Sequence, residues 1–229
     1  HCWLSGQATL CADDQRLQPD PQLRYRLRDF PLESLAEYLP DNLIWQGEVN
    51  ADLTLDLPSA GPSGSIRVDA GPGMLRMRDG EQWLDFPYQT LSLTSQLAPK
   101  QVDSRLRFEG GDLGDLDVRL QVDPSGEVKP ISGNFQLSNF DLSVIKPFVA
   151  QVERLDGQLN GNGQISGTLQ QPQINGELRL TEGEIAGAEL PVSFEQLQVT
   201  AIIDGERVRV DGDWRSGEQG QGQIAGTID

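Results

Sequence analysis

Few residues in this chain have the types and spacing that catalysis requires. The single histidine is His1, so neither a serine nor a cysteine nucleophile can be paired with a histidine base elsewhere in the chain. Two acidic pairs, Asp13–Asp14 and Asp211 with Asp213, offer oxygen ligands for calcium, but neither has the spacing of a known calcium loop. Solvated turn carboxylates are the commoner explanation for such pairs. We therefore expect no enzyme activity, no metal and no cofactor.

Cys2 and Cys11 are the two cysteines, and they lie close together at the start of the chain. The eight residues between them include Gly6, which allows the segment to close into a small loop. The spacing is not the C-x-x-C of a metal or redox site. We expect a disulfide, which would place the chain outside the reducing cytosol. Two buried free thiols are the alternative.

Charge and composition exclude several classes of partner. Among 229 residues there are 35 Asp and Glu against 18 Lys and Arg, a net charge of −17. A nucleic-acid-binding domain needs a basic surface, so we expect no nucleic-acid partner. The apolar share of 37% favours thin sheet layers with one wet face. No stretch approaches the roughly 20 apolar residues of a membrane span, and we expect any anchor or signal to lie upstream in a longer protein.

Most of the chain alternates apolar and polar residues with the period of two that is typical of strands. Each such strand has one apolar and one polar face. Glycines inside strands, such as Gly161 and Gly163, commonly mark bends or bulges. The predicted fold is therefore all-β, an elongated and strongly curved sheet. We expect one shared apolar surface to be lined by Leu53, Leu55, Leu91, Leu93, Leu106, Phe108, Leu116, Val118, Leu178, Leu180, Leu197, Val199, Val208 and Val210.

One segment of the chain occurs twice. Phe30–Pro40 (FPLESLAEYLP) reappears 110 residues later as Phe140–Ala150 (FDLSVIKPFVA). An internal repeat of this length indicates an architecture that grows by adding units and forms a long continuous surface. We predict a first unit over residues 1–112 and a second over residues 113–229, within one continuous structure.

Two short segments have helical spacing. Leu32, Leu35 and Leu39 fall on one face of a helix about two turns long. In the second copy Pro147 limits the helix to one or two turns. We expect each segment to form a short apolar cap on the sheet.

The apolar faces of the strands need cover, because so large an apolar area is unfavourable in water. A second sheet would cover them in a closed sandwich core, whereas a single sheet folded on itself would leave an apolar groove. A groove of aliphatic side chains suits acyl chains, since each buried CH₂ contributes about 0.8 kcal/mol. Periodicity alone leaves both arrangements open.

The second copy carries a regular pattern of glycines. It comprises Leu155-Asp156-Gly157-Gln158-Leu159, then Gly161, Gly163, Ile165, Gly167 and Leu169, then Pro172, Ile174, Gly176, Leu178, Leu180, Thr181 and Gly183. This run resembles the carboxy-terminal region of the TamB family, in which the pattern G-x-L-x-x-P-x-x-x-G-x-L-x-L-x-x-G is characteristic. The first copy departs from it by placing Leu53 and Leu57 where the second has Gly163 and Gly167, so a different curvature is expected there.

The resemblance implies a β-taco, an elongated sheet curved around an apolar groove. It implies a large periplasmic protein of Gram-negative bacteria, anchored in the inner membrane by an upstream segment, which bridges the inner and outer membranes. A TamA-like outer-membrane barrel would be its partner in outer-membrane protein assembly and in phospholipid transport, as in the similar AsmA-like lipid transfer proteins. The groove would hold phospholipid acyl chains or unfolded strands of outer-membrane proteins.

Three alternatives remain. A chaperone-like protein would pair an open sheet edge with unfolded outer-membrane protein strands by β-augmentation, without lipid transport. An extracellular adhesin or polysaccharide-binding repeat would need rows of exposed Trp and Tyr, and the chain has only three tyrosines. A glycan-cleaving enzyme would need an identifiable pair of carboxylates.

Overall fold

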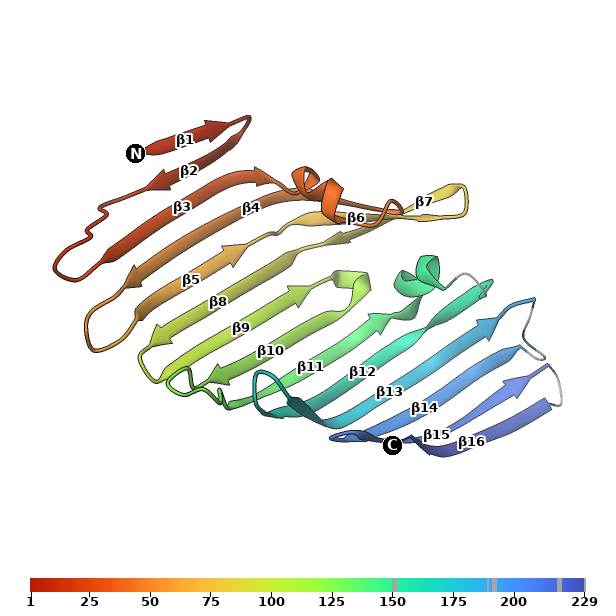
Figure 1. Ribbon diagram of the computed structural model, residues 1–229. Coiled ribbons are helices and arrows are strands. Elements are labelled where there is room, and N and C mark those ends of the chain that lie inside the picture. Colours follow the sequence, from red (N-terminus) through yellow and green to blue (C-terminus); the bar gives the residue numbers. More distant parts are fainter. Residues whose placement is uncertain (150–151, 189, 191–192, 218–219, 229) are drawn as a thin grey trace.

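The chain forms one large antiparallel sheet that does not close into a barrel (Figure 1). The computed structural model describes residues 1–149, 152–188, 190, 193–217 and 220–228, so Ala150 of the repeated segment lies outside the described residues. Strands make up 69% and helices 8% of the structure. The prediction of a curved all-β sheet with short helical segments is confirmed.

Among the described residues, fourteen strands follow one another across the sheet, and every neighbouring pair is antiparallel. They are β1 (Cys2–Ser5), β2 (Ala8–Ala12), β3 (Gln22–Pro31), β4 (Leu43–Asp56), β5 (Ser63–Asp69), β8 (Thr90–Ala98), β9 (Gln101–Glu109), β10 (Asp115–Val122), β11 (Ile131–Asp141), β12 (Arg154–Gly167), β13 (Pro172–Ala186), β14 (Phe194–Asp204), β15 (Arg207–Ser216) and β16 (Gly220–Ile228). Apart from one inserted hairpin, spatial order follows chain order, as expected where consecutive strands pair with each other.

The inserted hairpin, here called the flap, consists of β6 (Gly73–Asp79) and β7 (Gln82–Tyr88). It leaves the main sheet because the long strand β4 has two partners. Residues Asn50–Asp56 of β4 pair with β5, and residues Leu43–Gly47 pair with β6. Figure 1 shows the flap projecting beyond the end of the main sheet.

The duplication predicted from the repeated segment is visible in the backbone. In each copy a strand leads through a short 3₁₀ helix, η1 (Leu32–Tyr38) or η3 (Leu142–Phe148), into the next strand. Just before each helix the pairing register shifts at a residue with positive φ, Asp29 (53°) or Asn139 (51°). The bulged N–H of Asp29 donates to Asn50 Oδ1 at 3.2 Å, and that of Asn139 donates to Asn160 Oδ1 at 2.8 Å.

A close glycine contact also recurs. A Cβ on Gly47 would lie 3.2 Å from Gly73 Cα, and a Cβ on Gly157 would lie 2.9 Å from Gly183 Cα. Both Gly47 and Gly157 have φ near 135°, a conformation that other residues rarely adopt. The two units share one sheet, because β9 and β10 pair along their lengths. The division at residue 112 stays a prediction.

The helices differ in detail from the prediction. Both segments are 3₁₀ rather than α-helical, and a further 3₁₀ turn, η2 (Gly111–Leu113), was not predicted. Leu32 on η1 is the most completely buried large side chain in the described part of the chain, 1% exposed. It lies against Gly47, so η1 caps the point where β4 changes partners.

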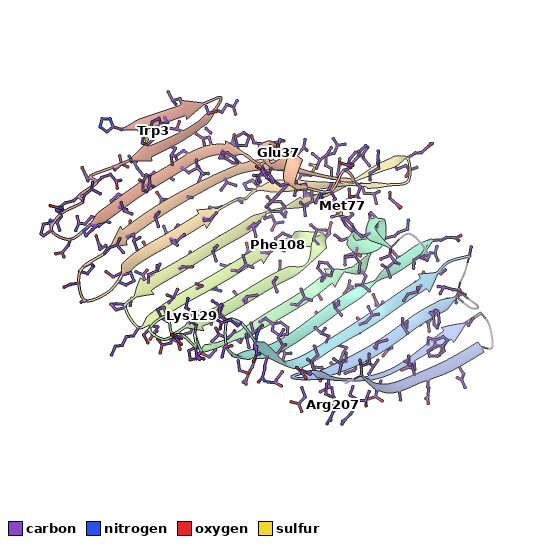
Figure 2. All side chains as sticks on the ribbon, in the orientation of Figure 1. Trp3, Glu37, Met77, Phe108, Lys129 and Arg207 are labelled. Atoms are coloured by element: carbon purple, nitrogen blue, oxygen red, sulfur yellow. A yellow bond between two sulfur atoms is a disulfide. The ribbon has the colours of Figure 1, made fainter. Side chains whose placement is uncertain are left out.

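A small hydrophobic core forms where the flap packs on the sheet. Its buried members are Met77, Tyr88, Leu113 and Val144, and Leu43, Trp45, Leu75, Phe86, Leu91, Phe108 and Phe140 pack against them. Met77 and Phe108 lie toward the end of the sheet from which the flap projects (Figure 2). An ion pair between Lys146 and Asp79 joins the flap to η3 of the second unit.

Tyr88 ties the flap to the sheet. Its hydroxyl donates to the Ala70 carbonyl at 2.6 Å and accepts from Trp45 Nε1 at 2.9 Å. Burial raises the pKa of Tyr88, so the phenol remains a neutral donor at physiological pH.

Most of the sheet remains a single layer. The chain exposes 14603 Å², whereas a compact monomer of its 25.1 kDa would expose roughly 10,300 Å². A closed sandwich core, the alternative considered above, would have removed much of this excess. The structure therefore supports an open sheet.

We expect Leu32→Ala to destabilise the protein by about 2–5 kcal/mol, because it leaves a cavity between η1 and Gly47. Such a loss lowers the melting temperature by roughly 5–15 °C in a chain of this length. Leu4→Ala is the control, since Leu4 is 78% exposed and its change should be within about 0.5 kcal/mol. Equal melting temperatures for the two variants would contradict the capping role of η1.

Candidate functional site

One row of directly paired residues crosses all fourteen strands of the main sheet. Each member is apolar or glycine, and each is the cross-strand partner of the next. This central row consists of Trp3, Leu10, Leu27, Ala51, Val68, Leu93, Leu106, Val118, Phe135, Gly163, Gly176, Ile203, Val208 and Ile228. Paired residues point to the same side of a sheet, so the row defines one continuous apolar face.

All fourteen residues predicted to line an apolar surface lie on this face. Leu93, Leu106, Val118 and Val208 belong to the central row itself. The others stand at neighbouring levels of the same face: Leu53, Leu55, Leu91, Phe108, Leu116, Leu178, Leu180, Leu197, Val199 and Val210. Their role as a binding surface stays a prediction.

The sequence reasoning missed several members of the row. Trp3, Leu10, Val68 and Ile228 stand in short or glycine-rich strands, where alternation extends over too few residues to stand out. Leu27 stands in the ten-residue strand β3, where alternation with Leu23 and Tyr25 could have identified it. The cross-strand register of the sheet shows that these residues belong to the central row. Figure 2 shows Trp3 at the first edge of the sheet, and Phe108 on β9, in the middle of the strand order.

The apolar face is open over much of its area. Leu197 is buried, at 7% exposed, whereas Leu93 is 36% exposed and most of the others are half-buried. The flap covers only the end near Leu91 and Phe108. An apolar ligand could therefore reach the rest of the face without any large movement of the chain.

Glycines let large side chains lie flat on this face. Phe135 covers Gly163, since a Cβ there would be 2.6 Å from its ring, and Leu178 and Trp214 similarly cover Gly161 and Gly222. The pairing register of β12 with β13 continues without a shift through Gly161 and Gly163, so neither marks a bulge, whereas a shift does occur at Gly157. That Gly161 and Gly163 mark bends stays a prediction. Their role is to give room to the side chain of the neighbouring strand, which buries apolar area without a second layer.

The opposite face of the sheet is polar. A hollow of about 850 Å³ is lined mostly by polar-face residues of the central strands, among them Arg67, Thr94, Arg105, Arg119 and Asn134. Hydrogen bonds from Arg105, one of them 3.0 Å long, lower the pKa of Asp117. That carboxylate therefore stays ionised, and the two faces differ sharply in polarity.

The two edges of the sheet also differ. At the first edge, a disulfide joins Cys2 and Cys11, which are direct cross-strand partners on β1 and β2. At the other edge, no strand among the described residues pairs with the outer side of β16. The residues of β16 are GQGQIAGTI, without a charge.

The described residues hold no cluster of three or more His, Cys, Asp or Glu that could bind a metal ion. None of the helices in the described ranges has the length and apolarity needed to cross a membrane. The arrangement can offer an apolar surface and a strand edge to a partner.

Comparison with known proteins identifies the family of this chain. No solved structure matches the chain. The family model described as TamB, N-terminal domain, matches residues 1–180. This confirms the family indicated by the glycine pattern, although the matching model describes the amino-terminal domain, not the carboxy-terminal region that the pattern resembles. Because the match covers most of its length, this chain belongs to the TamB family.

Proposed function

We propose that this chain is part of a periplasmic bridge between the inner and outer membranes, and that its apolar face carries phospholipid acyl chains. The observation that carries the proposal is the central row, which runs without a charged residue from Trp3 on β1 to Ile228 on β16. A structural core would be closed, whereas this row is long, continuous and accessible.

The dimensions of the row suit acyl chains. Strands lie about 4.8 Å apart, so fourteen strands span roughly 60 Å. The hydrocarbon core of a bilayer is about 30 Å thick, so one acyl chain occupies about 15 Å. The row could therefore accommodate roughly four chains end to end, enough for lipids to follow one another along the sheet.

Half-open binding supports movement along the row. Each methylene that leaves water contributes up to about 0.8 kcal/mol when fully buried, and less on a face that covers one side only. An acyl chain that moves from one strand to the next along the central row exchanges contact with one apolar side chain for contact with another. Such steps should cost little, because no charged side chain interrupts the row.

The wider assembly is also part of this proposal. A TamA-like outer-membrane barrel would be the partner, and an upstream segment would anchor the protein in the inner membrane. The Cys2–Cys11 disulfide suits an oxidising compartment such as the periplasm. We propose no catalytic role for the chain.

A second candidate function uses the backbone of a strand such as β16, whose residues carry no charge. An uncharged edge with unpaired backbone groups can add a strand from another chain. Under this alternative the protein shelters unfolded strands of outer-membrane proteins without transporting lipid. The two functions use different surfaces, since one depends on side chains of the apolar face and the other on the backbone of β16.

We expect Leu180→Asp or Val199→Asp to abolish lipid binding while leaving the protein folded. Both side chains are half-buried on the open face, so water can hydrate the new carboxylate, whereas an acyl chain cannot cross it cheaply. Leu197→Asp is the contrast, because Leu197 is 7% exposed and its substitution should unfold the protein. Thermal melting and co-purified lipid by native mass spectrometry report the two effects. Unfolding of all three variants would argue for a closed core.

A photocrosslinking amino acid at Leu106 should form lipid adducts in cells, and the same group at Arg107 should not. The two residues are neighbours on β9 and point to opposite faces, so Arg107 is a matched control for expression and folding. Adducts to protein from positions on β16, without lipid adducts at Leu106, would instead favour strand pairing with clients.

A further inference from the structure

Two serines interrupt the hydrocarbon lining in the middle of the apolar face. Ser95 on β8 and Ser104 on β9 are direct cross-strand partners, and their Oγ atoms lie 2.8 Å apart in a hydrogen bond. Both are half-buried. Ile66 and Leu120 flank them on the adjacent strands, so two hydroxyls face an otherwise aliphatic surface.

The pair leaves hydrogen-bonding capacity unused. Two hydroxyls supply two O–H donors, and the bond between them uses one. Within the described part of the chain, neither hydroxyl makes another hydrogen bond. One donor therefore remains available on the apolar face.

The second unit shows that the fold does not require these hydroxyls. Both units have the same ladder: Ile66, Ser95 and Ser104 in the first correspond to Gly176, Ile203 and Val208 in the second. An Ile–Val pair stands where the first unit has two serines. The hydroxyls thus add polarity at a position that accepts apolar side chains.

The chemistry that fits is a long apolar chain carrying a hydrogen-bond acceptor without charge. An ester carbonyl of a diacyl glycerolipid has this character. We propose that the Ser95–Ser104 pair donates a hydrogen bond to such an ester, so that the first unit prefers ester-linked to ether-linked lipid. This inference rests on the proposed lipid-binding function and adds to it a site of selection.

The expected preference is modest. A neutral hydrogen bond in a partly wet site changes an affinity by about two- to tenfold. The acyl or alkyl chains of the lipid should lie on the apolar residues to either side of the serine pair, and they should bind equally in the ester-linked and the ether-linked lipid. Selectivity should therefore depend on the serines, and total binding on the aliphatic residues.

The test is competition on the purified 229-residue chain between a phosphatidylethanolamine with two ester-linked oleoyl chains and its ether-linked counterpart. Native mass spectrometry measures the ratio of the two bound species. The wild-type protein should favour the ester by about two- to tenfold, the ratio that one neutral hydrogen bond supports. The variant Ser95→Ile with Ser104→Val, which copies the second unit, should bind both lipids equally and retain total binding.

Two controls accompany the variant. Ser92→Ala removes a hydroxyl from the opposite face of β8 and should keep the wild-type ratio. Ser95→Ala with Ser104→Ala removes both hydroxyls without adding volume, so equal binding of the two lipids by both double variants excludes a steric cause. Melting temperatures confirm that each variant is folded.

The outcomes separate the two proposals. Equal binding of both lipids by the wild type, or a preference that survives in the double variants, would overturn the role of the serines while leaving lipid binding intact. A wild-type protein that binds neither lipid would overturn the proposed function, and the serine site with it.

Discussion

An apolar face without a second layer above it is the constraint on which the rest of this structure depends. In a sandwich, each apolar side chain is covered from the opposite sheet. Here the side chains must cover one another. Phe135 lies over Gly163 and Trp214 over Gly222, so a large residue on one strand shields the backbone of the next. This arrangement replaces interlayer packing with packing along the layer, and outside the flap it leaves most of these side chains partly accessible.

The two units solve the same problem with different side chains. In the first, Tyr25 pairs with Leu53; in the second, Phe135 pairs with Gly163. The glycine leaves room for the ring of Phe135 to lie over the backbone of β12, room that Leu53 does not leave for Tyr25. The flap adds a third device in the first unit, since Tyr88 and Met77 close a small core over Leu91 and Phe108. The scaffold is thus constant while the depth and cover of its apolar face vary from unit to unit.

The faces of the strands could be predicted from sequence because alternation with period two is a local property. A shift of register by one residue would move a whole strand to the wrong face, and every predicted lining residue stands on the same face. The flap could not be predicted in this way. Met77 and Tyr88 belong to strands with ordinary alternation, and the close contact of Gly47 with Gly73, near which β4 changes partners, joins residues that are far apart in the sequence.

The form of the short helices and the role of the glycines could not be predicted from local sequence either. The helices η1 and η3 have seven residues each, which is too short for a stable α-helix. In η3, Pro147 is a further obstacle to an α-helix. Both segments therefore adopt the 3₁₀ form, which is common in short pieces. The glycine pattern identified the family, but its physical role depended on which side chain lay opposite, a fact that only cross-strand register supplies.

The acidic composition is consistent with an open apolar face. Charged side chains such as Arg105 and Asp117 pair with each other on the polar face, and the excess of acids leaves a net charge of −17. At physiological ionic strength, repulsion between two such chains acts within about 8 Å. When two apolar faces meet, their charged faces lie on the outer sides of the two sheets, farther apart than this distance. The net charge therefore opposes contact between polar faces and edges, and an uncharged hydrocarbon chain approaches the apolar face without this repulsion.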